Sequence, residues 1–138
     1  MKGVARLSYT ALAPETALAE ALANVRYYRL PAAKALPRVL VALRLTAKRV
    51  LDLRDGNARK TLGLSMKTIT SLDWRAENRN GSEAVTQAWG RAFAAAGFEA
   101  VIVPSAADPG GGNMLVFPEN LQPGSHFEVD TEIKWPLK

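Results

Sequence analysis

Ser105 ends an apolar run and opens a loop of small residues that holds three consecutive glycines at positions 110–112. Such a loop on a rigid scaffold is a common way to present a polar group to a ligand. It is also how many strands end. The glycines precede a second apolar run rather than a helix, so they lack the context of a phosphate-binding loop. The pattern predicts a flexible hairpin turn and leaves a ligand-binding role for Ser105 open.

Glu20 is the second candidate for chemistry, because it lies in a segment with helical spacing beside small residues that would leave room around its carboxylate. The apolar stripe of this helix is expected to face the core, and Glu20 lies on a different face. No Lys or Arg follows four residues later. A solvated glutamate and a functional carboxylate both remain open. Tyr9 raises the same choice, since a tyrosine at a strand end is most often a core aromatic whose hydroxyl reaches water.

Generic enzyme motifs are missing from the sequence. It contains no P-loop, no dinucleotide-binding fingerprint, no HExxH motif and no paired metal-ligand spacing. The absence of cysteine excludes disulfides and thiolate metal sites, and with His126 as the one histidine a structural zinc site is not expected. We therefore expect no metal cofactor.

Length and composition indicate one globular domain over residues 1–138, because 48% hydrophobic and 22% charged residues are close to the soluble average. No stretch approaches the roughly 20 apolar residues that a membrane span needs. The start, MKGVARLSYT, lacks the apolar core of a signal peptide. We expect a cytoplasmic protein with no membrane partner.

The net charge of +5 is concentrated in the middle of the chain. Between Arg26 and Arg91 lie 14 Lys or Arg and 5 Asp or Glu, whereas 6 acids and 2 lysines follow from Glu99 onward. This asymmetry suits either an anionic partner, such as a phosphate-bearing ligand, a nucleic acid or an acidic protein, or a solvated surface. A nucleic-acid-binding module ranks well below the other interpretations, because basic runs with interleaved aromatics are missing.

Strand and helix patterns alternate along the chain, which predicts an α+β fold with a mixed or mostly antiparallel sheet and flanking helices. We expect strands over residues 4–9, 38–45, 49–53, 98–103, 113–117 and 126–133.

Helices are expected over residues 13–28, 55–65 and 81–97, with a loop rich in Thr, Ser and Asn after residue 65. The first helix is expected to bury Leu18, Ala21, Leu22 and Val25. Ser82 is a suitable N-cap for the last helix, and Gly97 a suitable C-cap.

Two segments, LSYTALAPETALAEAL and GFEAVIVPSAADPGGGNMLVFPENLQPGS, resemble the RES domain family. Members pair a "YxA…ETALAE" segment with a later "GLLVPSA…NLVLFP" segment, in this order and at this separation. The resemblance covers nearly the whole chain and implies an ADP-ribosyltransferase-like fold that binds NAD as its substrate. It implies a bacterial toxin that degrades NAD by hydrolysis or phosphorolysis, or more rarely transfers ADP-ribose to a protein. The implied partner is an Xre-like helix-turn-helix antitoxin.

The resemblance also implies roles for individual residues. Glu20 matches the family's catalytic glutamate and Ser105 the serine of its PSA motif, whereas Tyr9 matches the tyrosine beside the nicotinamide and Asn113 the asparagine of its NL motif. Cleavage of the nicotinamide glycosidic bond develops positive charge on the ribose, so a fixed carboxylate stabilises the transition state more than the ground state. We expect Glu20 and Ser105 to be catalytic, and Tyr9, Ser105 and Asn113 to bind NAD in one cleft.

The chain departs from the family pattern near its start. Family members carry an arginine in an "RWNPxG"-like stretch before the tyrosine, and this arginine is thought to bind the NAD phosphates. Here only eight residues precede Tyr9, and Arg6, three positions away on a strand, would lie on the opposite face. Either the given start lies too late in the sequence to include this arginine, or the chain is a natural short form with weakened NAD binding. A non-catalytic homologue that binds a protein or nucleotide, and a protein ADP-ribosyltransferase, remain alternatives, and homo-oligomerisation is left open.

Overall fold

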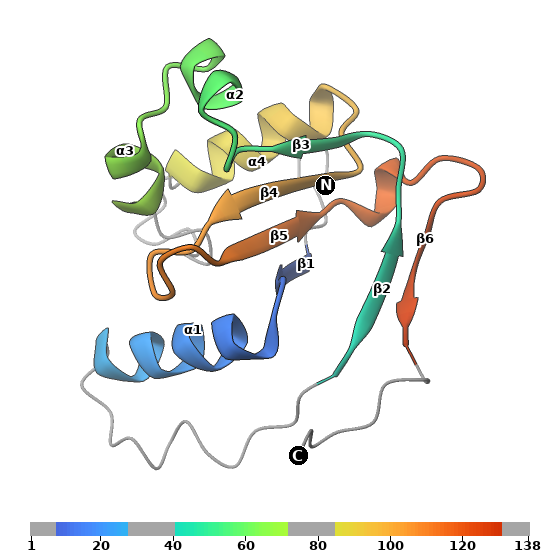
Figure 1. Ribbon diagram of the computed structural model, residues 1–138. Helices are drawn as coiled ribbons and strands as arrows, with labels where there is room; N and C mark the ends of the chain where they lie inside the picture. The colour runs from blue at the N-terminus through green and yellow to red at the C-terminus, as the bar shows by residue number, and fades with distance from the viewer. Residues whose placement is uncertain (1–7, 28–40, 72–84, 131–138) are drawn as a thin grey trace.

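The computed structural model describes residues 8–27, 41–71 and 85–130. In this part of the chain, helices flank a four-stranded mixed sheet, and a two-stranded sheet lies beside it (Figure 1). The predicted α+β class with a mixed sheet is confirmed. None of the helices within these ranges has the length and apolar character needed to cross a membrane.

The strands are β1 (Ser8–Ala11), β2 (Leu43–Thr46), β3 (Val50–Asp52), β4 (Ala100–Pro104), β5 (Gly112–Val116) and β6 (His126–Val129). The helices are α1 (Pro14–Tyr27), α2 (Gly56–Thr61), α3 (Met66–Ser71) and α4 (Val85–Ala95), with a 3₁₀ turn, η2, at Pro118–Asn120. All six predicted strands have a counterpart here, although residues 4–7, 38–40 and 131–133 of the predictions lie outside the described residues. β1 also continues two residues past Tyr9.

The central sheet has the order β1-β5-β4-β3, in which β3 and β4 run parallel and the other pairs antiparallel. Val101 pairs with Leu115 and Val103 with Asn113, so these four side chains share one face. That face carries the core, which α3 and α4 complete. The core side chains are Leu53, Leu64, Ile69, Phe93, Val101, Val103, Leu115 and Phe117.

α4 ends at the predicted glycine. Gly97 has a φ of 88°, which is a left-handed conformation that glycine adopts without steric cost. The Gly97 N–H donates to the Ala94 carbonyl (3.0 Å) and the Phe98 N–H to the Phe93 carbonyl (3.3 Å). This is the Schellman pattern, and it turns the chain directly into β4. The predicted N-cap, Ser82, lies outside the described residues.

The segment after residue 65, which the sequence predicts to be a loop, instead forms the short helix α3. Ser65 caps this helix, because its hydroxyl accepts a hydrogen bond from the Thr68 N–H (3.1 Å). One turn later Ile69 is fully buried in the core. The polar composition suggested a loop, but the cap and one buried side chain are sufficient for a helix.

The structure also corrects the prediction of which face of α1 packs against the rest of the protein. Leu18 is 45% exposed, whereas Thr16 is 1% exposed. Ala21 and Leu22 are only partly buried, and the side chain of Val25 lies outside the described part. The helix face that holds Thr16 and Glu20 therefore faces the sheet, because these two side chains form hydrogen bonds with the loop that follows β4.

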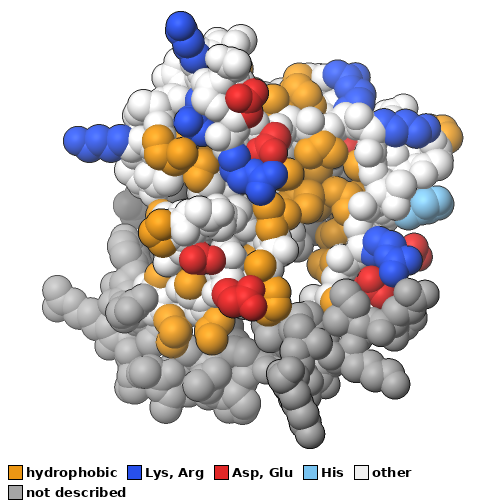
Figure 2. Space-filling view, in the orientation of Figure 1, with side chains coloured by type: hydrophobic (Ala, Val, Ile, Leu, Met, Phe, Trp, Pro, Cys, Tyr) orange, Lys and Arg blue, Asp and Glu red, His pale blue; other side chains and the backbone are white. Residues whose placement is uncertain are grey.

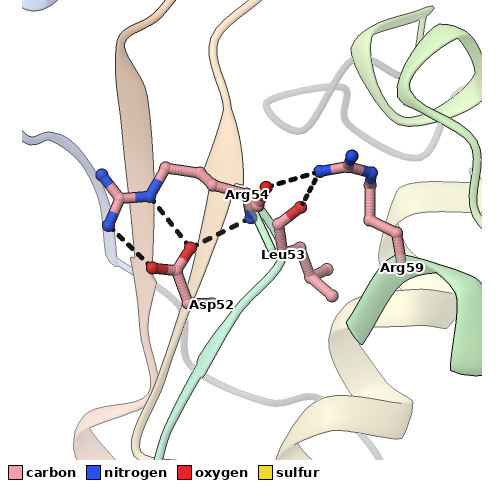
Figure 3. A network of polar contacts seen from close by, with 4 residues as sticks. All are labelled: Asp52, Leu53, Arg54 and Arg59. Atoms are coloured by element: carbon pink, nitrogen blue, oxygen red, sulfur yellow. Dashed lines mark hydrogen bonds and ion pairs between the residues drawn. The ribbon is translucent and has the colours of Figure 1, made fainter. Parts of the chain in front are cut away.

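The junction between β3 and α2 is fixed by two arginines (Figure 3). Arg54 donates from Nε and Nη2 to the two Asp52 oxygens (2.9 and 2.7 Å), and these bonds lower the pKa of Asp52. Arg59 Nη1 donates to the carbonyls of Leu53 and Arg54, at 2.8 Å each. The Asp52–Arg54 pair is partly exposed, so its worth is about 1 kcal/mol or less, and its main effect is to set the direction of the chain.

Glu99, immediately before β4, is completely buried. Its Oε1 accepts from the backbone N–H groups of Lys48 (3.0 Å) and Arg49 (2.9 Å), and its Oε2 accepts from the N–H of Gln122 (3.2 Å). The neighbouring Ser125 hydroxyl and these N–H groups lower the pKa of Glu99 from 4.5 to about 2, although burial acts in the opposite direction. The carboxylate thereby joins the β2–β3 and η2–β6 connections to the central sheet.

We predict that Glu99→Gln lowers the melting temperature at pH 7 by several degrees, because the amide NH₂ would face backbone donors. A carboxyl with a lowered pKa stabilises the fold above its unfolded value of 4.5, and this contribution is lost as the pH falls toward about 2. The difference between variant and wild type should therefore shrink over that interval. Thermal melts followed by circular dichroism measure this difference in melting temperature. Glu128→Gln is the control, because it removes the same charge from an exposed side chain. Equal melting of Glu99→Gln and wild type at pH 7 would contradict the assignment.

Candidate functional site

α1 presents its polar residues to the end of the central sheet where the β4–β5 hairpin loop lies. Pro14 occupies the first helical position, where its missing N–H costs nothing. Thr16 and Glu20 follow four residues apart and so lie one above the other on one face. α1 follows β1, an edge strand of the central sheet, almost directly and lies beside that strand's side of the sheet (Figure 1).

The Glu20 carboxylate meets two polar side chains from the second half of the chain. Ser105 Oγ donates to Glu20 Oε2 at 2.6 Å, and Asn113 Nδ2 donates to the same oxygen at 2.8 Å. Ser105 is 4% exposed and Asn113 is 1% exposed. The structure thus brings together three of the four residues selected from the sequence, although 93 positions separate Glu20 from Asn113.

The fourth residue, Tyr9, lies in β1. Its backbone pairs in register with Leu115, two positions along β5 from Asn113. Its side chain lies outside the part of the chain that the structure describes. The expected contact of Tyr9 with a ligand therefore stays a prediction.

Ser105 Oγ and Asn113 Nδ2 are neutral donors, so these two hydrogen bonds hold the Glu20 carboxylate in place without adding a positive charge beside it. Hydrogen bonds to a charged group are worth about 1.5–3 kcal/mol each, more than neutral ones. A carboxylate fixed in this way suits two chemical tasks. It can stabilise a cation that develops in front of it, and it can accept a proton from an attacking group.

Asn113 also carries a buried acceptor without a donor. Among the described residues its Oδ1 has no hydrogen-bond partner, although the atom is buried. An unsatisfied buried acceptor costs about 1–3 kcal/mol, so each one calls for an explanation such as a bound water, an ion or a functional role. A ligand hydroxyl or amide that reached this carbonyl would satisfy it.

The loop that follows Ser105 is the predicted hairpin turn, and it is closed by its own hydrogen bonds. The Ser105 N–H donates to the Gly111 carbonyl (3.1 Å), and the Gly111 N–H donates to the Asp108 carbonyl (2.8 Å). Gly110 has a φ of 86°, where a side chain would be strained. The glycines therefore serve the turn itself.

Sequence reasoning missed two residues of this site. Thr16 Oγ1 donates to Asp108 Oδ2 at 2.6 Å, and the Asp108 N–H donates to Ser105 Oγ at 3.1 Å. The available signal was the spacing of Thr16 and Glu20, four residues apart on one helix face. In the described residues no group of three His, Cys, Asp or Glu side chains is placed to hold a metal ion.

Basic side chains do not gather into one patch on the face shown in Figure 2. Among the described residues the Lys and Arg side chains lie apart around a centre of hydrophobic ones (Figure 2). On this face the described Lys and Arg side chains are therefore dispersed.

Comparisons with known proteins agree with the sequence resemblance. The model of the RES domain family matches residues 5–138. Among solved structures, the chain is similar to one in the crystal structure of the M. tuberculosis MbcT–MbcA toxin–antitoxin complex, with a TM-score of 0.67 and 23% identity. The match covers 92% of this chain and 64% of that one, so it spans less than two thirds of the neighbour. No curated protein matches the sequence.

We predict that Gly111→Ala disturbs this site. A Cβ at residue 111 would lie 2.6 Å from Thr16 Oγ1 and 2.8 Å from Asp108 Oδ2, closer than real Cβ contacts allow. Overpacking of this kind costs about 1–3 kcal/mol, which urea unfolding followed by circular dichroism would detect. Gly90→Ala is the control, because no described residue lies within 4 Å of its Cβ position. Unchanged stability of Gly111→Ala would show that the loop does not pack on α1 as described.

Proposed function

This chain belongs to the RES domain family, and from that premise we propose that it is a toxin that binds NAD and cleaves the nicotinamide glycosidic bond. The fold class expected from the resemblance, α+β of the ADP-ribosyltransferase-like type, is confirmed. The observation that carries the proposal is the Glu20 carboxylate, which Ser105 and Asn113 hold by two neutral hydrogen bonds.

The proposed reaction breaks the bond between the ribose anomeric carbon and the nicotinamide ring nitrogen. The bonding electron pair leaves with the nicotinamide, so the ribose gains positive charge in the transition state. Glu20 faces this charge and stabilises it most when it is greatest, which lowers the barrier. Ser105 and Asn113 contribute by fixing the carboxylate in advance, so little reorganisation is needed during the reaction.

An acceptor then adds to the anomeric carbon, with water giving ADP-ribose and phosphate giving its 1-phosphate. When the acceptor is water, its proton passes to Glu20 or to solvent. A protein nucleophile in the same position would make the chain an ADP-ribosyltransferase. Adding phosphate to the assay separates phosphorolysis from hydrolysis.

NAD fits the polar groups present at the site. Asn113 Oδ1, which has no hydrogen-bond partner in the described part of the chain, is an acceptor, and NAD offers donors in its ribose hydroxyls and in its carboxamide. Tyr9, in the neighbouring strand β1, is proposed to stack on the nicotinamide, which adds roughly 0.5–1.5 kcal/mol beyond the buried area.

We further propose that a helix-turn-helix antitoxin of the Xre-like type binds the chain and covers the site. The similar solved structure is a toxin–antitoxin complex, which supports an antitoxin partner for a protein of this fold. The excess of basic residues between Arg26 and Arg91 suits an acidic antitoxin surface.

The decisive assay is nicotinamide release from NAD, with and without added phosphate. We predict that Glu20→Gln lowers kcat/KM by about 100-fold or more, because the amide keeps the shape of the carboxylate but not its charge. Glu15→Gln, on the first turn of the same helix, is the matched control and should retain activity. If wild type releases no nicotinamide, the chain is better described as a non-catalytic homologue, and if Glu20→Gln matches the wild-type rate, Glu20 is not the catalytic carboxylate.

A second prediction concerns the partner. Expression of the chain alone should deplete cellular NAD and arrest growth, and co-expression of a helix-turn-helix protein encoded beside it should restore both. NAD content and colony counts are the measurements, with Glu20→Gln as the non-toxic control. Failure to recover such a protein in a pull-down from the native host, together with no such neighbouring gene, would argue against an antitoxin.

A further inference from the structure

A second polar contact joins α1 to the loop that carries Ser105. Thr16 Oγ1 donates to Asp108 Oδ2 at 2.6 Å, and Thr16 is only 1% exposed. Glu20 lies one helical turn farther on the same face and accepts from Ser105. α1 therefore holds the loop at two points, of which the proposed reaction uses one.

The two contacts are connected through Ser105. The Asp108 backbone N–H donates to Ser105 Oγ at 3.1 Å, and the same hydroxyl donates to Glu20 Oε2 at 2.6 Å. An oxygen that accepts one bond and donates another has a fixed orientation. The position of Asp108, which Thr16 fixes, thus determines where the Ser105 proton points.

Stability alone does not explain a polar pair at this place. A part-buried hydroxyl–carboxylate contact must recover the cost of leaving water, and apolar residues of similar shape would serve the fold nearly as well. Hydrogen bonds restrict the two groups to one relative geometry more strictly than apolar packing does. The adjacent Gly111 leaves space for the pair, because a Cβ there would collide with both partners.

We propose that Thr16 and Asp108 are positioning residues that hold the Ser105–Glu20 hydrogen bond in its reactive geometry. This inference rests on the proposed cleavage of NAD. Neither residue touches the reacting atoms. They act through Ser105, so their loss lowers kcat and leaves KM for NAD nearly unchanged.

The test compares Thr16→Val, which removes the hydroxyl and keeps the shape, with Thr16→Ser, which keeps the hydroxyl. Thr16→Val should lower kcat at least tenfold with KM within threefold, and Thr16→Ser should recover most of kcat. Thr10→Val is the matched control, because Thr10 Oγ1 bonds the Met114 carbonyl in the sheet instead. Its kcat should remain within threefold of wild type.

A measurement without NAD separates this inference from the proposed function. The Asp108 N–H bonds to Ser105 Oγ and the Gly111 N–H to the Asp108 carbonyl, so NMR hydrogen exchange of both amides should accelerate at least tenfold in Thr16→Val and not in Thr10→Val. If both exchange rates stay at the wild-type value, Thr16 does not fix the loop and the inference fails, even where Glu20→Gln has abolished cleavage. If exchange accelerates but kcat does not fall, the contact is structural only, and the inference fails as well. Wild type without any cleavage would overturn the proposed function and the positioning role with it, and accelerated exchange would then describe a loop contact alone.

Discussion

The buried carboxylate of Glu99 is the junction on which the arrangement of the two sheets depends. Its backbone bonds Arg49 on one side (2.8 Å) and Phe117 on the other (2.9 Å). Its side chain accepts from three further N–H groups and so supplies each of them with an acceptor. One residue thus sets the start of β4 and the positions of the segments that lead to β3 and β6. A lowered pKa is the expected result of so many donors around one carboxylate.

The candidate site lies at the other end of the strand that Glu99 begins. β4 runs from Ala100 to Pro104, and Ser105 follows immediately. β4 is also central in the sheet, with β3 and β5 on its two sides. A central strand fixes the backbone position of the loop residue that follows it. The hydrogen bonds within the 105–111 loop then fix the path of the loop. The precision of the Ser105–Glu20 contact therefore comes from the sheet on one side and from α1 on the other.

Much of this architecture could be predicted from local signals. Apolar runs predicted the bounds of β3, β4 and β5 to within two residues, and Gly97 predicted where α4 ends. These signals depend only on residues that are neighbours in the sequence. The local pattern made Ser105 and Glu20 candidates but left their roles open, and the family resemblance supplied those roles and added Asn113. The contacts of Thr16 with Asp108 and of Glu99 with Lys48 span 92 and 51 positions. Nothing local encodes such contacts, and they emerge only once the fold is known.

The orientation of α1 shows how the site and the fold constrain each other. Apolar periodicity would turn Leu18 inward, yet Leu18 is 45% exposed and Thr16 is buried. Burying a leucine side chain is worth about 1.5–3 kcal/mol, so the observed rotation gives up part of that energy. Departures from such local rules are expected where a side chain serves a function. Two hydrogen-bonded contacts, Thr16–Asp108 and Glu20–Ser105, hold the helix in this orientation. A helix that rotated to bury Leu18 would remove Glu20 from its donors, so the less favourable packing of α1 is a condition of having the carboxylate in place.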